Sequence, residues 1–208
     1  MTLFHSLQGA GGAGGAVPTF VEASIGPRGG SNSVVPALSS VQNGDLLIAF
    51  VMKSTSGRTF TAPAGFSSVT SDNSDKPSVE IFTKTASSES GTYTFTSSGA
   101  GSMQATILVY SPASVNLSGS WNRASSDTQT ALSISPTAKG VLLAYFALSR
   151  NETVSTPPSG MTQRAIFSNS GVATTQYELS PSAAGSTGNK VIVWSGSDDG
   201  ANILLQIE

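Results

Sequence analysis

The stretches Asp45-Leu-Leu-Ile-Ala-Phe-Val-Met52 and Val141-Leu-Leu-Ala-Tyr-Phe-Ala-Leu148 decide the fold of this chain. Each is an almost continuous apolar run that begins directly after a glycine and is soon followed by serine or threonine. A run of this length fits either a buried strand or a buried helical segment. The short length and the flanking residues favour a strand that is covered on both faces.

The two runs belong to an internal repeat. Residues 17–112 and 113–208 have equal lengths, and a spacing of 96 residues superimposes apolar residues and glycines of one copy on those of the other. The matched pairs are Gly44 and Gly140, Leu46 and Leu142, Leu47 and Leu143, Phe50 and Phe146, Ala105 and Ala201, Ile107 and Ile203, and Leu108 and Leu204. These matches keep their order along the chain, which indicates an ancestral duplication.

A turn motif occurs once in each copy. Thr61-Ala-Pro-Ala-Gly-Phe66 is matched by Thr156-Pro-Pro-Ser-Gly-Met161 after one residue of slippage, and Phe82 then falls on Tyr177. Proline restricts φ, and the glycine two residues later accepts a positive φ, which is typical of a turn. Each copy therefore has the order apolar strand, turn, aromatic-containing strand.

Further β-rich segments flank these motifs in both copies. The predicted strands are 20–24, 33–38, 79–85, 92–96 and 104–110 in the first copy, and 115–118, 129–134, 174–179, 190–194 and 201–207 in the second. No long window shows a helical period with a cap. The sequence therefore predicts ten to twelve strands in an all-β, jelly-roll-like β-sandwich that is built from two duplicated halves.

The arrangement of the two halves admits two interpretations. A run that is apolar on both faces needs cover from two sides, which one half would struggle to provide alone. We therefore expect one compact sandwich over residues 17–208, formed by two interleaved halves that a pseudo-two-fold axis relates. Two tandem sandwiches are the alternative.

Residues 1–16 are expected to form a flexible arm. Gly9-Ala-Gly-Gly-Ala-Gly-Gly15 holds five glycines in seven residues, and glycine loses the most backbone entropy on ordering. Leu3, Phe4 and Leu7 precede this tether, and they are candidate assembly contacts with a neighbouring subunit. The alternative is a disordered tail without a partner.

The composition excludes several classes of function. Charged residues make up 11% of the chain, and ten Lys and Arg face twelve Asp and Glu, so we expect no nucleic-acid partner. Cysteine is absent, which excludes disulfides and thiolate metal sites. The longest apolar run is shorter than the roughly 20 residues of a transmembrane helix, so we expect no membrane partner. Met1–Leu7 also lacks the features of a secretory signal.

No catalytic constellation is evident, and we expect a protein that is not an enzyme and needs no cofactor. His5 is the single histidine, and it has no neighbouring acid or nucleophile. Glu80 and Glu178 lie on similar strands, and glycoside hydrolysis uses a pair of carboxylates. We nevertheless expect both to be ordinary solvent-facing strand residues.

Two acidic loops and two tryptophans are the remaining candidates. Asp72-Asn-Ser-Asp75 and Asp198-Asp199 offer oxygen ligands for Ca²⁺, but their spacing does not match an EF-hand, and ordinary polar turns are expected. Trp194 lies in an apolar strand and is expected in the core. Trp121 lies in a polar stretch, where it either stacks on a ligand or packs beneath a loop.

These motifs resemble a β-sandwich module of bacteriophage virion proteins, which occurs in tail fibres, baseplates, capsid accessory proteins and some bacterial surface proteins. The resemblance rests on Val41-Gln-Asn-Gly-Asp-Leu-Leu-Ile-Ala-Phe50, Thr61-Ala-Pro-Ala-Gly-Phe66, Glu80-Ile-Phe-Thr-Lys-Thr-Ala86 and Tyr93-Thr-Phe95. It covers about residues 20–208 and carries no catalytic residues. The chain departs from the family at Phe66, where tryptophan is common, and at Val141, where the first copy has Asp45.

The resemblance implies a structural role. A stand-alone module with a short arm suits a capsid decoration, or cement, protein that binds the major capsid protein or other virion proteins and stabilises the particle surface. It is expected on the virion, after assembly in the host cytoplasm. We also expect a homo-oligomer, for which we take a trimer as the hypothesis. The alternatives are a tail-fibre or tail-tip protein and a lectin-like adhesin for host-surface glycans, with Trp121 as the candidate stacking residue.

Overall fold

The computed structural model describes residues 17–136, 138–169 and 171–208. All regular secondary structure in these ranges is β-strand, which confirms the all-β prediction. The first repeat contains β1 (Thr19–Ile25), β2 (Asn32–Val35), β3 (Leu46–Lys53), β4 (Phe60–Thr61), β5 (Ser67–Asp72), β6 (Ser78–Thr85), β7 (Tyr93–Ser97) and β8 (Met103–Ser111). The second contains β9 (Val115–Ser118), β10 (Asn122–Ala131), β11 (Gly140–Leu148), β12 (Val154–Thr156), β13 (Thr162–Asn169), β14 (Val172–Ser182) and β15 (Lys190–Ile207). The expected arm, residues 1–16, lies outside the described residues.

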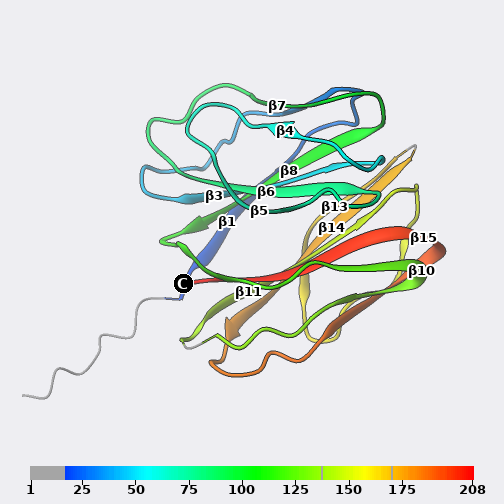
Figure 1. Cartoon of the computed structure of the whole chain (residues 1–208). Coiled ribbons are helices and arrows are strands. Elements are labelled where there is room, and N and C mark those ends of the chain that lie inside the picture. The colour runs from blue at the N-terminus through cyan, green and yellow to red at the C-terminus, as the bar shows by residue number, and fades with distance from the viewer. Residues whose placement is uncertain (1–16, 137, 170) are drawn as a thin grey trace, which may run out of the picture.

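The strands form four stacked layers, two from each repeat (Figure 1). In the first repeat a five-stranded sheet, β1-β8-β3-β6-β5, packs against a three-stranded sheet, β2-β7-β4. In the second repeat one sheet, β10-β15-β11-β14-β13 with β9 and β12 also paired to β15, supplies both layers. It does so because β10 and β15 are long, and their paired segments Thr128–Ala131 and Lys190–Val193 pack back over β11.

The two long apolar runs are central strands with both faces buried, as predicted. In β3, Leu46, Ile48 and Phe50 point into a core between the repeats, whereas Leu47 and Ala49 point into the first repeat's own core. The side chains of β11 alternate in the same way. Because successive side chains of a strand point to opposite faces, a strand with cover on both sides is apolar at every position.

The two halves are not interleaved, contrary to our expectation. Among the described residues each hydrogen-bonded sheet takes its strands from one repeat, so each repeat is a two-layer sandwich of its own. The two inner sheets then pack face to face, with β1 beside β13 and Arg123 of β10 against Asp72 of β5. Phe50 and Tyr145 meet across this contact with ring centroids 4.9 Å apart. The outer layer of the same repeat thus covers one face of each apolar run, and the inner sheet of the other repeat covers the opposite face.

The structural repeat of these strands is 95 residues, one fewer than the sequence alignment of the apolar runs indicates. Leu47 and Leu142 each point into the core of their own repeat, and so do Phe82 and Tyr177. A spacing of 96 would match Leu46 to Leu142, yet Leu46 points into the core between the repeats. A shift of one residue reverses every side chain on a strand, so the 96-residue match is wrong for these strands.

Two irregularities of the sheets recur at the 95-residue spacing. The bulge of β5 inserts Val69, and the bulge of β13 inserts Arg164. The bulge of β1 inserts Val21, and that of β9 inserts Asn116. Bulges are typically retained within a family of related structures. The two repeats therefore share their strand order and two of their bulges.

Several strand boundaries differ from the predicted ones. The predicted strands 190–194 and 201–207 are the two ends of one strand, β15. The strands β4, β5, β12 and β13 are absent from the prediction, because they are very short or lack the regular apolar alternation of a half-buried strand. These four strands lie at the ends of their layers, where tertiary contacts rather than sequence pattern define them.

Candidate functional site

We call the contact between the two inner sheets the seam. A candidate site lies at the edge of the seam where β1 is beside β13. An open pocket with a volume of about 520 Å³ lies there. Its lining comes from the start of the described chain, from β13 with its preceding turn, and from β14. The lining residues are Val17, Pro18, Thr19, Phe20, Gly160, Thr162, Arg164, Glu178, Leu179 and Ser180. We call this the seam pocket.

Glu178 is the charged centre of the seam pocket. Its side chain is 5% exposed, so the expectation of a solvent-facing carboxylate is wrong. Arg164 donates two hydrogen bonds to it, from Nε to Oε2 and from Nη2 to Oε1, both 2.8 Å long. The Tyr110 hydroxyl of the first repeat donates a third, 2.7 Å to Oε2. Burial and the negative charge of Glu178 raise the pKa of Tyr110, which keeps this hydroxyl protonated as a donor.

Arg164 reaches across the seam because it is the extra residue of the β13 bulge. Its guanidinium carbon lies 4.4 Å from the centroid of the Phe20 ring, and Phe20 packs edge-on against Tyr110 at 5.6 Å. The network therefore joins β13 and β14 of the second repeat to β1 and β8 of the first. Sequence reasoning missed Arg164, since the bulge that directs it arises from strand pairing and leaves no mark in the hydrophobic pattern.

The seam pocket has the chemistry of a binding site for a polar ligand or a peptide. Arg164 and Glu178 neutralise each other, and the other polar side chains of the lining are the hydroxyls of Thr19, Thr162 and Ser180. Hydroxyl groups both donate and accept hydrogen bonds, and a guanidinium in a fixed geometry adds further donors. These groups suit a ligand that is rich in hydroxyl or amide groups.

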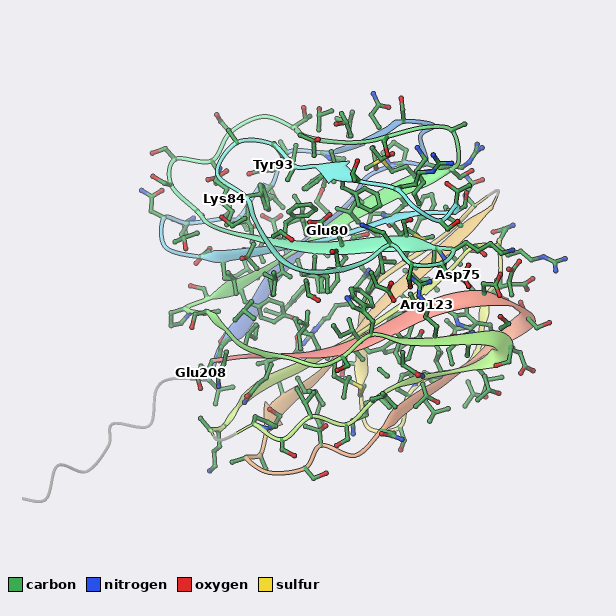
Figure 2. The ribbon with its side chains drawn as sticks, viewed as in Figure 1. Asp75, Glu80, Lys84, Tyr93, Arg123 and Glu208 are labelled. Carbon is green, nitrogen blue, oxygen red and sulfur yellow. The ribbon has the colours of Figure 1, made fainter. Side chains whose placement is uncertain are left out.

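The two acidic loops meet at the opposite side of the seam, where ion pairs hold them. Arg123 Nε lies 2.7 Å from Asp72 Oδ2, and Figure 2 shows Arg123 between the two repeats, close to the loop of Asp75. Lys76 Nζ lies 2.9 Å from Asp199 Oδ2. The loops thus link the repeats. Among the described residues no group of three or more His, Cys, Asp or Glu side chains is arranged to hold a metal ion.

The substitution Arg123→Leu is expected to lower the free energy of unfolding by about 2 kcal/mol at neutral pH. Burial by itself would raise the pKa of Asp72, but hydrogen bonds from Arg123 and Ser74 outweigh it and lower the pKa to about 2. A carboxyl whose pKa falls on folding stabilises the fold above its unfolded value of 3.8, and this contribution is lost as the pH falls toward 2.

Urea unfolding of the unmodified chain and of Arg123→Leu, measured from neutral pH down to about pH 2, tests this ion pair. The difference between the two proteins is expected to shrink across the lower part of that window. Lys76→Met removes a more exposed cation and serves as the control, with little effect at any pH. A difference for Arg123→Leu that is independent of pH would contradict the assignment.

The two tryptophans have different environments. Trp194 is 1% exposed in the core of the second repeat, which confirms its predicted place. Trp121 packs against the core between the repeats, edge-on to Tyr145 with 6.2 Å between ring centroids. Its Nε1 donates a hydrogen bond to Thr70 Oγ1 of the first repeat at 3.1 Å. These contacts favour the packing interpretation of Trp121 over ligand stacking.

The other sequence candidates are not brought together. Glu80 is half-buried on the sheet face opposite Val79 and Ile81, which point into the core between the repeats. Glu178 lies on the face that meets the other repeat, so the two carboxylates point in different directions. Burial raises the pKa of Glu80. Four candidates lie outside the described residues: Leu3, Phe4, His5 and Leu7.

Comparison with known proteins adds no assignment to these sites. No family model, curated protein or solved structure matches the chain. In the part of the chain that the structure describes, no helix has the length and apolarity that a bilayer crossing requires.

Proposed function

We propose that the protein is a structural component of a bacteriophage particle, and specifically a capsid decoration protein that binds the head surface and stabilises it. In this role it is not an enzyme and needs no cofactor. Its partners are the major capsid protein or other virion proteins and further copies of itself, and it is located on the virion after assembly in the host cytoplasm. The motifs that resemble virion β-sandwich modules support this proposal, as do two features of the molecular surface.

The observation that carries the proposal is a pair of matching sheet faces on the two outer layers. Their ten residues are uncharged, and Lys190 lies at the border of the second face. Each face is the outward side of strands whose other side points into a repeat's own core. The first face consists of Asn32, Val34, Thr61, Thr94 and Thr96, and the second of Thr128, Thr130, Thr156, Val191 and Val193. In both faces these residues are direct cross-strand neighbours, and all but one are β-branched.

Such faces suit close packing against another protein surface. Threonine and valine have few side-chain rotamers, so little conformational entropy is lost when they are covered. An uncharged face also avoids the desolvation penalty that buried ions carry. Because the two faces lie on opposite outer layers, one molecule can contact two neighbours at once, as a protein that links subunits on a particle requires.

The start of the described chain is the second supporting feature. Val17 lines the seam pocket, so residues 1–16 are attached at the surface of the molecule beside the seam. Leu3, Phe4 and Leu7 supply apolar contacts within this segment. The ten residue steps from Leu7 to Val17 span up to about 35 Å when extended, which is enough to reach an adjacent subunit.

Purified particles of the phage that encodes the chain provide the test. We expect the protein in virions at a fixed ratio to the major capsid protein, with density for a four-layer β-protein on the head in cryo-electron microscopy. The variant Thr94→Lys/Val191→Lys places a charge on each outer face and is expected to be lost from particles, whereas Ser90→Lys, an exposed loop position, is retained. Absence of the unmodified protein from purified virions would overturn the proposal.

A tail-fibre or tail-tip protein, or a lectin-like adhesin, is the second candidate, and the seam pocket favours it. The hydroxyls of Thr19, Thr162 and Ser180 beside Arg164 form a polar lining of the kind that hydrogen-bonds sugar hydroxyls. Binding on a glycan array that disappears in Thr162→Val/Ser180→Ala would support this role. Location on heads without any glycan binding would contradict it.

A further inference from the structure

The second repeat has an open groove at the edge of its own core. The groove has a volume of about 430 Å³, and its lining includes Val154, Pro157, Met161, Ile166 and Tyr177. Val154 and Met161 pack partly buried against the second repeat's core, and Ile166 is 40% exposed. Thr153 and Gln163 complete the lining, so the groove combines apolar side chains with polar ones, and Ile166 is a large apolar side chain open to solvent. We call this the Met161 groove.

The first repeat closes the corresponding place with its own aromatic side chains. Phe66 stands 95 residues before Met161, after the equivalent turn, and packs edge-on against Tyr93 and Phe95 at 5.9 and 5.5 Å between centroids. Lys84 Nζ lies 5.9 Å from the centroid of the Phe66 ring, and Figure 2 shows Lys84 beside Tyr93. The mouth of the first repeat's core is therefore filled by an aromatic cluster.

The second repeat lacks this cluster. The positions of the two repeats can be matched from the strand registers and from the core toward which each strand face points. Four positions of the first repeat then correspond to four of the second: Phe66 to Met161, Tyr93 to Lys190, Phe95 to Ile192 and Phe82 to Tyr177. Three of the four rings are therefore replaced by side chains without a ring. Tyr177 is retained, lines the groove and packs against Phe146 with 6.4 Å between centroids. A ring that enters the groove would find the apolar and edge-on contacts that aromatic side chains prefer.

We infer that the N-terminal segment of the same chain supplies this ring. Leu3-Phe4-His5-Ser6-Leu7 docks in the Met161 groove of the free protein, and Phe4 takes the place that Phe66 has in the first repeat. The segment suits the groove chemically, because Leu3, Phe4 and Leu7 are apolar and residues 2–16 contain no Asp, Glu, Lys or Arg. Docking covers Ile166, which is otherwise open to solvent.

The groove lies within reach of the N-terminal segment. Val17 and Thr162 line the seam pocket, and Met161, the neighbour of Thr162, lines the groove. Since β13 is the edge strand of its sheet, the path runs around one strand, a distance on the order of 10 Å. The nine glycine-rich residues between Leu7 and Val17 have a root-mean-square span of roughly 17 Å. A linker of nine residues sets a local concentration in the millimolar range, which favours the chain's own groove over that of another copy.

Methionine methyl resonances provide the first test, on the full chain labelled with methyl-¹³C methionine. Deleting residues 2–16 is expected to move the resonance of Met161, because the ring of Phe4 no longer lies beside it. Met52 and Met103 are fully buried in the other two cores and serve as internal controls. Phe4→Ala is expected to reproduce the effect of the deletion, whereas His5→Ala leaves Met161 near its original position.

A peptide-binding experiment provides the second test. A fluorescently labelled peptide of residues 1–9 is expected to bind the variant that lacks residues 2–16. Met161→Phe restores the ring of the first repeat and closes the groove, so peptide affinity is expected to fall at least about tenfold, or about 1.4 kcal/mol. Met161→Leu keeps the groove open and is the matched control, and an unchanged melting temperature of Met161→Phe shows that the loss is not due to unfolding.

The inference fails if the Met161 resonance is unaffected by both the deletion and Phe4→Ala. It also fails if the change appears only at concentrations where size-exclusion chromatography with light scattering detects oligomers, because the segment then belongs to a neighbouring copy. Both experiments use the isolated protein, so they are independent of whether the protein is found in virions. Failure of the docking and failure of the proposed function are therefore distinguishable.

Discussion

Replacing Tyr145 with alanine lowers the free energy of unfolding by about 3–5 kcal/mol. Tyr145 is fully buried in the core between the repeats, where its ring packs against Phe50 and lies edge-on to Trp121. Alanine removes these contacts and leaves a cavity between two sheets that relax only partially to fill it. Equilibrium unfolding in urea, followed by tryptophan fluorescence, measures the loss.

Tyr145→Phe is the matched control, and it is expected to be at least as stable as the unmodified chain. Burial raises the pKa of the Tyr145 hydroxyl, and this hydroxyl has no hydrogen-bond partner among the described residues. Removing a buried polar group without a partner removes a desolvation penalty while the ring contacts remain. The change also makes position 145 identical to Phe50, its counterpart in the first repeat. A large loss for Tyr145→Phe would show that the hydroxyl is hydrogen-bonded in solution.

Replacing Arg164 with valine is the second large effect, with an expected loss of about 3 kcal/mol. The substitution leaves Glu178 buried at 5% exposure with only the Tyr110 hydroxyl as a partner. The expected loss lies at the low end of the range for broken buried ion pairs, because the Arg164 side chain is 27% exposed. Arg164→Lys keeps the charge but cannot form the two parallel hydrogen bonds. Its free energy of unfolding is therefore expected to lie between those of the unmodified chain and Arg164→Val.

The first repeat supplies the control for this ion pair. Val69 and Thr83 occupy the positions of Arg164 and Glu178 in the inner sheet of the first repeat, so Arg164→Val/Glu178→Thr installs a pair that the equivalent sheet already contains. The double variant is expected to recover most of the stability that Arg164→Val loses, because no unpaired charge stays buried. A double-mutant cycle in urea gives the coupling energy directly. Equal losses for the single and double variants would mean that Arg164 acts through packing on Phe20 rather than through Glu178.

The second repeat has two features that are absent from the equivalent positions of the first repeat. The two sandwiches share strand order and bulges, and the ion pair of Arg164 and the Met161 groove lie in the second repeat. Val69 and Phe66 fill the same two positions of the first repeat with apolar side chains. The first repeat has the same strand order without these features, so this arrangement of strands does not depend on them. Arg164 lines the seam pocket together with Val17, and Met161 of the groove directly precedes Thr162 of that pocket.

The apolar runs were sufficient to predict central strands and the all-β class. A strand that is apolar at every position must be covered on both sides, and the paired proline-glycine turns mark where each copy repeats. The predicted spacing of the apolar runs was wrong by one residue. At 96 residues Leu46 and Leu47 align with the identical residues Leu142 and Leu143, whereas the fold matches Leu47 to Leu142 at 95 residues. Identity alone does not report which face a leucine occupies.

The candidate sites could be predicted only in part. Trp194 was placed in the core because its neighbours are apolar, and that local signal was enough. Glu178 was placed in solvent because a carboxylate on a strand is usually exposed, and its partners Arg164 and Tyr110 lie 14 and 68 residues away in the chain. No local sequence pattern predicts such a pair, because its burial results from the packing of one repeat against the other.

The sequence by itself determined the all-β class, the central apolar strands and the repeated proline-glycine motifs of this protein, because these depend on residue type and on periods of a few residues. Only the tertiary structure decided that each repeat forms its own two layers, that the inner sheets meet through Phe50 and Tyr145, and that one repeat keeps an open groove where the other holds Phe66. The physical reason is that these features depend on strand registers, which pair residues far apart in the chain. A register shift of one residue moves every side chain of a strand to the opposite face of the sheet.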